Sequence, residues 1–233
     1  DSTNNKVVIA WQNTSNSNYG TAVVGTVSGT DISFGSVVVF ESATTGGPKL
    51  VHDVGANKIV IQYSDQGNSN YGTAIIGTIS GTSISFGTAS VYNSSTEYDA
   101  RQPVYDSTNN KTVLVYQDYG DGEKGKARVL SISGTTPSFG TEVTFESQKA
   151  NPLVATFDSN IGKVAIGYYD ETPTNMRHIT GTVSGTDISF GSELDITSDT
   201  AQPSLGAAAF DPNTGKVLYV VRNVTQSNKP YAA

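Results

Sequence analysis

Residues 25–35, G-T-V-S-G-T-D-I-S-F-G, are the strongest indication of the fold, because this stretch recurs twice more in the chain of 233 residues. It recurs as G-T-I-S-G-T-S-I-S-F-G at residues 77–87 and unchanged at residues 181–191. A related run, S-I-S-G-T-T-P-S-F-G, occupies the corresponding place at residues 131–140. Self-similarity at a fixed spacing is typical of repeat proteins, so the chain is interpreted as an array of similar units.

A second landmark is an aspartate that is followed five positions later by a lysine. The spacing of these pairs is about 52 residues, which is in the range of β-propeller blades. It predicts one repeat domain, residues 1–233, with repeats at 1–52, 53–105, 106–157, 158–210 and a partial repeat at 211–233. The aspartates are Asp1, Asp53, Asp106, Asp158 and Asp211, and the lysines are Lys6, Lys58, Lys111, Lys163 and Lys216.

Each unit contains signals for four short strands and none for a helix. The first strand precedes the aspartate, as at residues 153–157 and 207–210, and a tight hairpin turn follows it. The second strand is an almost unbroken apolar run, as at residues 7–11 and 59–63, which suits a strand buried on both faces. One turn column holds residues that tolerate positive φ, namely Asn5, Asn57, Asn110, Gly162 and Gly215.

The third and fourth strands surround the recurring Ser-Gly-Thr turn. The third begins near Thr21 and contains small residues at Gly25, Gly77 and Gly181, where a bulge or a close approach of neighbouring backbone is expected. The fourth strands begin at Ile32, Ile84, Pro137 and Ile188, and their phenylalanines are expected in equivalent environments: Phe34, Phe86, Phe139 and Phe190. Four strands and four turns account for the period.

These features predict an all-β fold of tandem four-stranded antiparallel units, a β-propeller of about five blades with the first and last incomplete. The run D-P-N-T-G-K-V-L-Y-V at residues 211–220 resembles the first hairpin of bacterial propeller blades. The whole unit resembles the blade repeats of large bacterial surface proteins and phage tail-fibre-like proteins. This resemblance covers essentially the full chain, implies architecture, and carries no catalytic residue across.

Composition excludes several function classes. The net charge of -7 and the scattered basic residues argue against a nucleic-acid partner. No apolar stretch reaches the length of a membrane-spanning helix, so no membrane partner is expected. The absence of cysteine excludes thiol chemistry, and the polar, acidic composition favours an extracellular, cell-surface or virion location.

Catalytic and metal sites are not indicated. His52 shares a column with Tyr105 and Phe157 and is assigned a packing role, whereas His178 is expected at the surface. No Gly-x-Ser-x-Gly elbow of a serine hydrolase is present. A sialidase-like glycan hydrolase is a distant alternative, because the chain lacks the arginine cluster and the Ser-x-Asp-x-Gly motifs that such an enzyme needs. The column of opening aspartates could form a calcium ring, but turn formation alone explains it. The chain is therefore predicted to be no enzyme and to hold no cofactor and no metal.

The two sets of loops differ, and this contrast is the main indication of function. The turns within the first and third hairpins are short and constant, whereas the loops after the second strands vary, as in N-T-S-N-S-N-Y-G and D-Y-G-D-G-E-K-G. Variable loops on a constant scaffold are typical of recognition, which predicts binding to glycan or protein surfaces. The predicted ligand-binding residues are Tyr19, Tyr71, Asp65, Asp118, Tyr119 and Asp170.

Two further expectations concern the surface and the edges of the fold. Asn-x-Ser/Thr acceptors occur at Asn13, Asn93 and Asn223, and their expected loop placement permits glycosylation. Incomplete end units would leave apolar strand edges unpaired, and such edges recruit other strands. The alternative function is therefore a structural repeat of a fibre or filament, in which further copies of the chain share strands and no ligand is bound.

Overall fold

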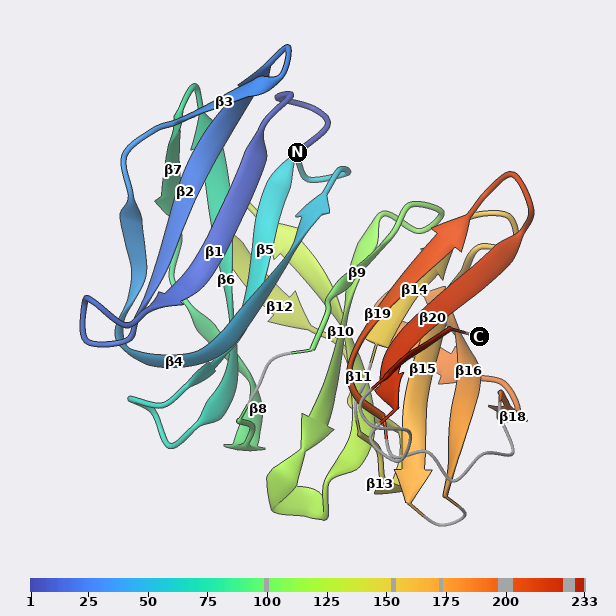
Figure 1. Cartoon of the computed structure of the whole chain (residues 1–233). Helices are drawn as coiled ribbons and strands as arrows, with labels where there is room; N and C mark the ends of the chain where they lie inside the picture. Colours follow the sequence, from blue (N-terminus) through green and yellow to red (C-terminus); the bar gives the residue numbers. More distant parts are fainter. Residues whose placement is uncertain (99–100, 152–153, 172–173, 197–202, 224–228, 233) are drawn as a thin grey trace.

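The structure, a computed structural model, describes residues 1–98, 101–151, 154–171, 174–196, 203–223 and 229–232 (Figure 1). This part of the chain is all-β, as predicted, and every strand pair in it is antiparallel. Its one helical element is the three-residue 3-10 helix η1 (Tyr119–Asp121). No helix among the described residues is long and apolar enough to span a membrane.

The strands form five units, which are numbered here 1 to 5 along the chain. Each of units 2 to 5 begins with the strand that precedes the opening aspartate, so it starts a few residues before the predicted repeat boundary. Unit 1 comprises β1 (Val7–Asn13), β2 (Tyr19–Ser28), β3 (Asp31–Phe34) and the first part of β4 (Val38–Asp53). Unit 2 comprises the rest of β4, β5 (Lys58–Asp65), β6 (Tyr71–Ser80), β7 (Ser83–Phe86) and β8 (Ser90–Thr96). Unit 3 comprises β9 (Val104–Asp106), β10 (Lys111–Asp118), β11 (Lys124–Ser133), β12 (Thr136–Phe139) and β13 (Val143–Lys149).

The last two units continue the pattern. Unit 4 comprises β14 (Val154–Asp158), β15 (Lys163–Glu171), β16 (Thr174–Ser184), β17 (Asp187–Phe190) and β18 (Leu194–Asp195), and unit 5 comprises β19 (Pro203–Asp211), β20 (Lys216–Asn223) and β21 (Lys229–Ala232). Within a unit the strands pair in sequence order, as the repeat pattern predicted. The units follow one another along a curved path, with the two ends of the chain in different units (Figure 1).

Two details of the sheets differ from the prediction. The fourth strand of units 1 to 4 is split in two, because it is interrupted directly after the recurring phenylalanine, at Gly35, Gly87, Gly140 and Gly191. Units 1 and 2 are not separate sheets: β4 runs without a break from unit 1 into unit 2, pairing first with β2 and then with β5. These two units therefore form a single eight-stranded sheet.

The hairpin turns have the predicted conformation. Asn5, Asn57 and Asn110 have φ of 52°, 51° and 52°, and Gly162 and Gly215 have φ of 64° and 67°. The opening aspartates accept backbone hydrogen bonds inside the same turns, as from Asn4 N to Asp1 Oδ1 at 2.8 Å and from Ala56 N to Asp53 Oδ1 at 2.9 Å. This bonding accounts for the aspartate column as a turn feature.

The third-strand glycines accommodate side chains rather than neighbouring backbone. A β-carbon on Gly25 would lie 2.8 Å from Cδ1 of Ile32 and 3.1 Å from Cε1 of Phe34, both on the paired strand. Gly77 and Gly181 have the same neighbours in their own units. The prediction of a bulge or of neighbouring backbone was therefore wrong at these positions, because the glycines make room for the isoleucine and phenylalanine side chains of the paired strand.

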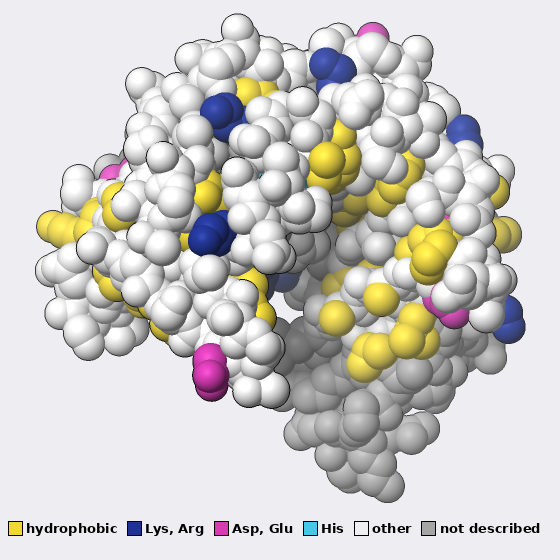
Figure 2. Space-filling model, turned by 90° about the horizontal axis from the view of Figure 1, so that it is seen from above, with side chains coloured by type: hydrophobic (Ala, Val, Ile, Leu, Met, Phe, Trp, Pro, Cys, Tyr) yellow, Lys and Arg dark blue, Asp and Glu magenta, His cyan; other side chains and the backbone are white. Residues whose placement is uncertain are grey.

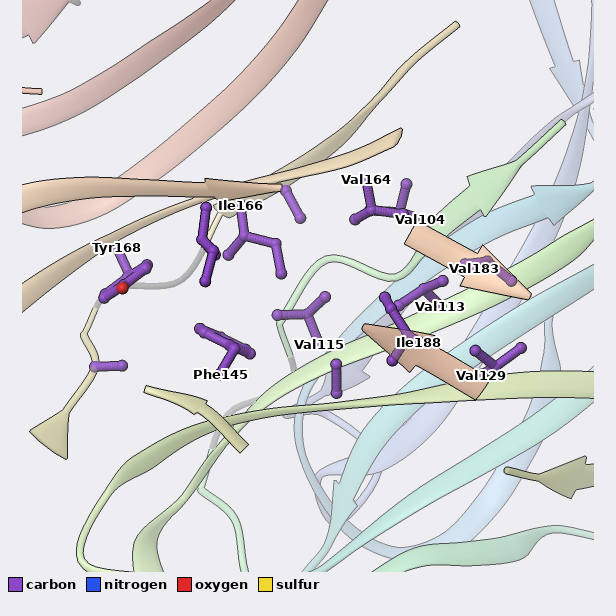
Figure 3. Close-up of a cluster of buried hydrophobic side chains, with 14 residues drawn as sticks. Val104, Val113, Val115, Val129, Phe145, Val164, Ile166, Tyr168, Val183 and Ile188 are labelled. Atoms are coloured by element: carbon purple, nitrogen blue, oxygen red, sulfur yellow. The ribbon is translucent and has the colours of Figure 1, made fainter. Parts of the chain in front are cut away.

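Adjacent units pack face to face, and an aromatic ring of one unit lies between two rings of the next. The ring centroid of Phe40 in unit 1 lies 5.3 Å from that of Tyr63 and 5.6 Å from that of Phe86 in unit 2. Tyr92 has the same relation to Tyr116 and Phe139, and Phe145 to Tyr168 and Phe190. Figure 3 shows the last of these interfaces, with Phe145 and Val115 of unit 3 facing Ile166 and Tyr168 of unit 4.

The four recurring phenylalanines are therefore not in equivalent environments. Phe86, Phe139 and Phe190 pack against the preceding unit, whereas Phe34 of unit 1 is 52% exposed. The prediction was wrong for Phe34, because its environment depends on a neighbouring unit and not on its own strand.

Candidate functional site

The long and short loops lie at opposite ends of the units, as the strand order requires. In Figure 1 the hairpin turns before the second strands lie at the top, and the loops after β1, β5 and β10 lie at the bottom of their units. Each of the first three bottom loops is bonded to the end of its own unit's fourth strand: Thr45 N donates to Asn18 O at 3.1 Å, Glu97 N to Asn70 O at 2.8 Å and Ala150 N to Glu123 O at 3.1 Å. We call this end the loop face.

The opposite end is the turn face, which Figure 2 shows from above. It is hollowed near its centre, and its charged side chains are scattered rather than clustered. A depression of about 480 Å³ on this side is lined by Asp53, Asn110, Lys111 and Ser131. The Lys111 ammonium in it donates to Ser131 Oγ at 2.8 Å, so this cation is engaged within its own sheet.

Tyr19, Tyr71 and Asp65 lie at the loop face, and all three are half-buried. The two tyrosines begin β2 and β6, and each pairs with the last residue of the strand before it, so that Tyr71 lies opposite Asp65. Asp65 Oδ1 accepts a hydrogen bond from Gly67 N at 3.0 Å, which shapes the loop. These residues lie at the loop face, as predicted, and the contacts that they make there shape the loops.

Asp118 and Asp170 are buried, contrary to the expectation that they face a ligand. Asp118 caps η1 by accepting from Gly120 N and Asp121 N, and it accepts from Lys126 Nζ at 2.7 Å. Asp170 lies 3.3 Å from Arg177. Both carboxylates follow a second strand as predicted, but the side chain that faces them from the third strand is basic and engages them.

Lys126 is the centre of a charged cluster in unit 3. Its ammonium lies 2.7 Å from Asp118, 2.9 Å from Asp121 and 3.0 Å from Glu142. Burial would lower the pKa of Lys126, but these hydrogen bonds outweigh it and raise the pKa above its usual value. Hydrogen bonds from Lys124 and Lys126 lower the pKa of Asp121 to about 2.

Unit 4 has a cluster of the same form around Arg177, which pairs with Asp170, Glu193 and Asp195. In units 1 and 2 the basic position is occupied by Thr21 and Thr73. The charged side chains therefore form internal ion pairs in two units, and their positive member occupies the space between the carboxylates.

Two tyrosines, Tyr98 and Tyr119, form a partly exposed aromatic pair at the loop face, and only Tyr119 was predicted from the sequence. Tyr119, which was predicted, lies in η1, and its ring centroid is 4.8 Å from that of Tyr98 in an edge-to-face arrangement. Tyr98 follows β8 and is 52% exposed. It lies outside the repeated columns, so no sequence signal marked it.

A ladder of polar side chains lies on the same face in unit 3. Arg101 donates to Gln117 Oε1 at 2.9 Å and to Asn151 Oδ1 at 3.3 Å. Gln117 Nε2 donates to Glu123 Oε2 at 3.2 Å, and Lys149 Nζ lies 3.2 Å from the same oxygen. Arg101, Glu123, Lys149 and Asn151 are half-buried, so the ladder presents amide, guanidinium and carboxylate groups at the surface.

Beneath this ladder lies a buried carboxyl group. Glu97 is fully buried and its Oε1 accepts from Tyr92 Oη at 2.6 Å, while Gln62 Nε2 donates to the same tyrosine oxygen at 2.9 Å. Burial raises the pKa of Glu97 to about 8, although the hydrogen bonds and Arg101 act in the opposite direction. At neutral pH the carboxyl is therefore largely protonated.

The predicted glycosylation acceptors have different placements. Asn13 is the half-buried last residue of β1, and its Oδ1 accepts from Ser15 N at 3.2 Å. Asn93 lies within β8 and is buried, so its expected loop placement was wrong and the folded chain does not present it to solvent. Asn223 ends β20.

The two histidines both lie at contacts between units. His52 packs as predicted, with its Nε2 3.3 Å from Asp1 Oδ1. His178 was expected at the surface, but it is half-buried between units 4 and 5, and its Nδ1 lies 2.6 Å from Tyr219 Oη. Burial lowers the pKa of His178. His178 and Tyr219 line a cavity of about 370 Å³ together with Asp158 and Val217.

The chain matches no known family model and no curated protein. The candidate site therefore stands on its geometry alone. We define it as the loop-face patch formed by Tyr98, Tyr119, Arg101, Glu123, Lys149 and Asn151, with Gln117 buried beneath it.

Proposed function

We propose that this protein is a recognition module built as an arc of β-propeller blades, which binds glycan or protein surfaces through its loop face. The observation that carries the proposal is the exposed ring of Tyr98, held edge-on by Tyr119 on the same face as the Arg101 ladder. A fixed aromatic ring offers apolar contact area at low entropic cost, and planar amide and guanidinium groups supply directed hydrogen bonds.

The architecture supports this use of the loops. Stacked sheets with interlocked aromatic rings make a rigid support, and residues on rigid supports can be placed without ordering a mobile segment on binding. Stacked four-stranded units with the loops gathered at one end are the arrangement expected of propeller blades. We propose binding rather than catalysis, because Asp118 and Asp170 form ion pairs with basic neighbours.

The resemblance of the units to bacterial surface and phage tail-fibre-like repeats, together with the polar composition without cysteine, supports an extracellular, cell-surface or virion setting. Glycans and proteins are the partners that such a surface meets.

The test is saturable binding of the 233-residue chain to a glycan array and to a panel of cell-surface proteins. Tyr98→Ala should weaken the binding by about tenfold, as expected for a central aromatic contact. Val91→Ala, which trims another exposed apolar side chain that is not part of the patch, should leave it unchanged. Binding that both variants retain, or the absence of saturable binding in both assays, would contradict the proposal.

A second candidate is a structural unit that assembles by sharing strands. β21 pairs with β20 only from Val220 to Asn223, so no described residue pairs with this edge of β20 along residues 216–219. Such an edge can accept a strand from another chain. Electron microscopy of the concentrated protein would show filaments if the edges are shared, and only discrete particles if they are not.

A further inference from the structure

One face of unit 1 is apolar and uncovered by any described residue. We define this front face by Val7, Ile9, Val27, Ile32, Phe34 and Val37, all of which are exposed. Val7 and Ile9 alternate along β1 with Val8, which packs into the interface with unit 2, so they point to the other side of the sheet. Large exposed apolar faces of this kind mark interaction sites.

The same face is buried in units 2, 3 and 4. Ile9 is 42% exposed, whereas the residues at its position in units 2, 3 and 4, Ile61, Leu114 and Ile166, are 0% exposed. Ile32 is exposed, whereas Ile84 and Ile188 at its position are buried. In each of these units, the front face packs against the preceding unit. The chain thus contains three examples of what covers a front face.

The aromatic positions of the front face in unit 1 are also filled. Trp11 stands at the position of Tyr63, and Phe34 at the position of Phe86. In unit 2, the rings of Tyr63 and Phe86 enclose Phe40 of unit 1. Val37 takes the position of Ala89, so this face carries no charge where Glu142 and Glu193 stand in units 3 and 4. The front face of unit 1 is therefore more apolar than that of units 3 and 4.

Unit 5 carries the opposite surface. Its back face consists of Ala207, Ala209, Leu218 and Val220, all exposed. Leu218 is 47% exposed, whereas Val60 and Val113 at its position in units 2 and 3 are 0% exposed because the next unit covers them. Back faces of this kind are what the front faces of units 2, 3 and 4 pack against.

We propose that the front face of unit 1 binds the back face of unit 5 in a second copy of this chain, which continues the packing between units from one molecule to the next. The interface is head-to-tail, so each copy has one surface of each kind. It involves faces of the sheets, and it is independent both of what the loop face binds and of strand sharing at the edges.

The experiment measures the mass of the 233-residue chain in solution by light scattering and sedimentation, from about 1 µM to about 1 mM, the range of dissociation constants of weak to moderate interfaces. The mass should rise above the 24.4 kDa of one chain as concentration increases. Trp11 is the only tryptophan, so its emission should shift to the blue in parallel as the front face is covered. A mass of one chain at every concentration would overturn the proposal.

Two variants make the direction of the contact testable. The front variant carries Ile9→Lys and Phe34→Lys, and the back variant carries Leu218→Lys and Val220→Lys, all at exposed positions. Each alone should stay at the mass of one chain, and an equimolar mixture should form a 1:1 complex of twice that mass. The complex should show the Trp11 shift, because the back variant retains an intact front face.

The control is Val91→Lys, an equally exposed apolar position outside both faces, which should associate like the parent chain. Circular dichroism and thermal melting verify that all variants are folded. If the back variant associates as strongly as the parent chain, two front faces bind each other and the head-to-tail proposal is wrong. A mixture of the two variants that remains at the mass of one chain would also overturn it.

Discussion

The main-chain carbonyl oxygen of Thr82 lies 1.9 Å from the place that a β-carbon on Gly35 would occupy. Gly35 follows the recurring phenylalanine of unit 1, and Thr82 is in the Ser-Gly-Thr turn of unit 2. The same contact joins Gly87 to Thr135 and Gly140 to Thr186. The repeated Phe-Gly and Ser-Gly-Thr motifs are thus two halves of one contact between successive units.

This contact predicts that Gly87→Ala destabilises the fold, because the added methyl would meet backbone that cannot rotate away. We expect a loss of about 1–3 kcal/mol in the free energy of unfolding, as for overpacked sites. Gly191→Ala is the matched control, since its β-carbon would come no closer than 3.4 Å to its neighbours in the described structure. Equal effects in urea denaturation would contradict this account.

The Lys126 cluster predicts a large loss of stability on removal of the ammonium. Lys126→Met should cost about 3–5 kcal/mol, because Asp118 would remain buried without its cation. Lys124→Met removes an exposed ion pair with Asp121 and should cost less than about 1 kcal/mol. Urea denaturation at neutral pH measures both, and a small effect of Lys126→Met would show that Asp118 is held by its backbone donors alone.

The same cluster predicts a loss of stability in acid. The pKa of Asp121 is lowered to about 2 and that of Glu142 is lowered as well, so the folded state favours their charged forms. Their contribution is complete above the unfolded pKa values near 4 and is lost as pH falls toward 2. Lys126→Met should reduce this acid dependence of the denaturation midpoint, and an unchanged pH profile would speak against the ion pairs.

Glu97 predicts the opposite pH dependence. Its pKa is raised to about 8 by burial, so the folded state binds a proton that the unfolded chain releases near pH 4.5. Its effect should make the protein less stable as pH rises from about 4.5 to about 8. Glu97→Gln should remove this slope and stabilise the protein at pH 8 by about 1–3 kcal/mol. Equal stability of the parent protein and the Glu97→Gln variant at pH 8 would show that the carboxylate is solvated.

His178 predicts a pH-sensitive attachment of unit 5. Burial lowers its pKa, so its stabilising contribution is complete above pH 6.5 and is lost as pH falls through its folded pKa. Magnetic resonance titration should place this pKa below that of a free histidine. Tyr219→Phe, which removes the hydroxyl at 2.6 Å, should increase hydrogen exchange in β19 and β20 by about fivefold, equivalent to about 1 kcal/mol. Unchanged exchange would mean that the hydroxyl does not support the contact.

Much of the local structure was predictable from residue type. The turns at Asn5, Asn57 and Asn110 required residues that tolerate positive φ, and the opening aspartates were recognisable as turn acceptors. Strand order within a unit followed from the alternation of apolar runs and turns. The candidate site was predictable only in part: the loops and Tyr119 were identified, but Tyr98 and Arg101 belong to no repeated column.

The remaining features depend on contacts between residues that are distant in the chain. Asp118 and Asp170 stand in the same column as Asp65, yet they are buried, because Lys126 and Arg177 face them from the next strand where unit 2 has Thr73. His178 is covered by Tyr219, which is 41 residues further along the chain. A pattern within one strand does not contain this information.

The repeat, the strands of each unit and the conformation of their turns could be predicted from residue type, because they depend on backbone preferences and on neighbours a few residues away. Which copies of a repeated residue are buried depends on the packing between units and was not predictable in this way. Phe34 and Phe86 belong to nearly identical stretches, but Phe86 packs on unit 1 and Phe34 is 52% exposed. The physical reason is that burial belongs to the pair of packed units and not to the strand that carries the side chain.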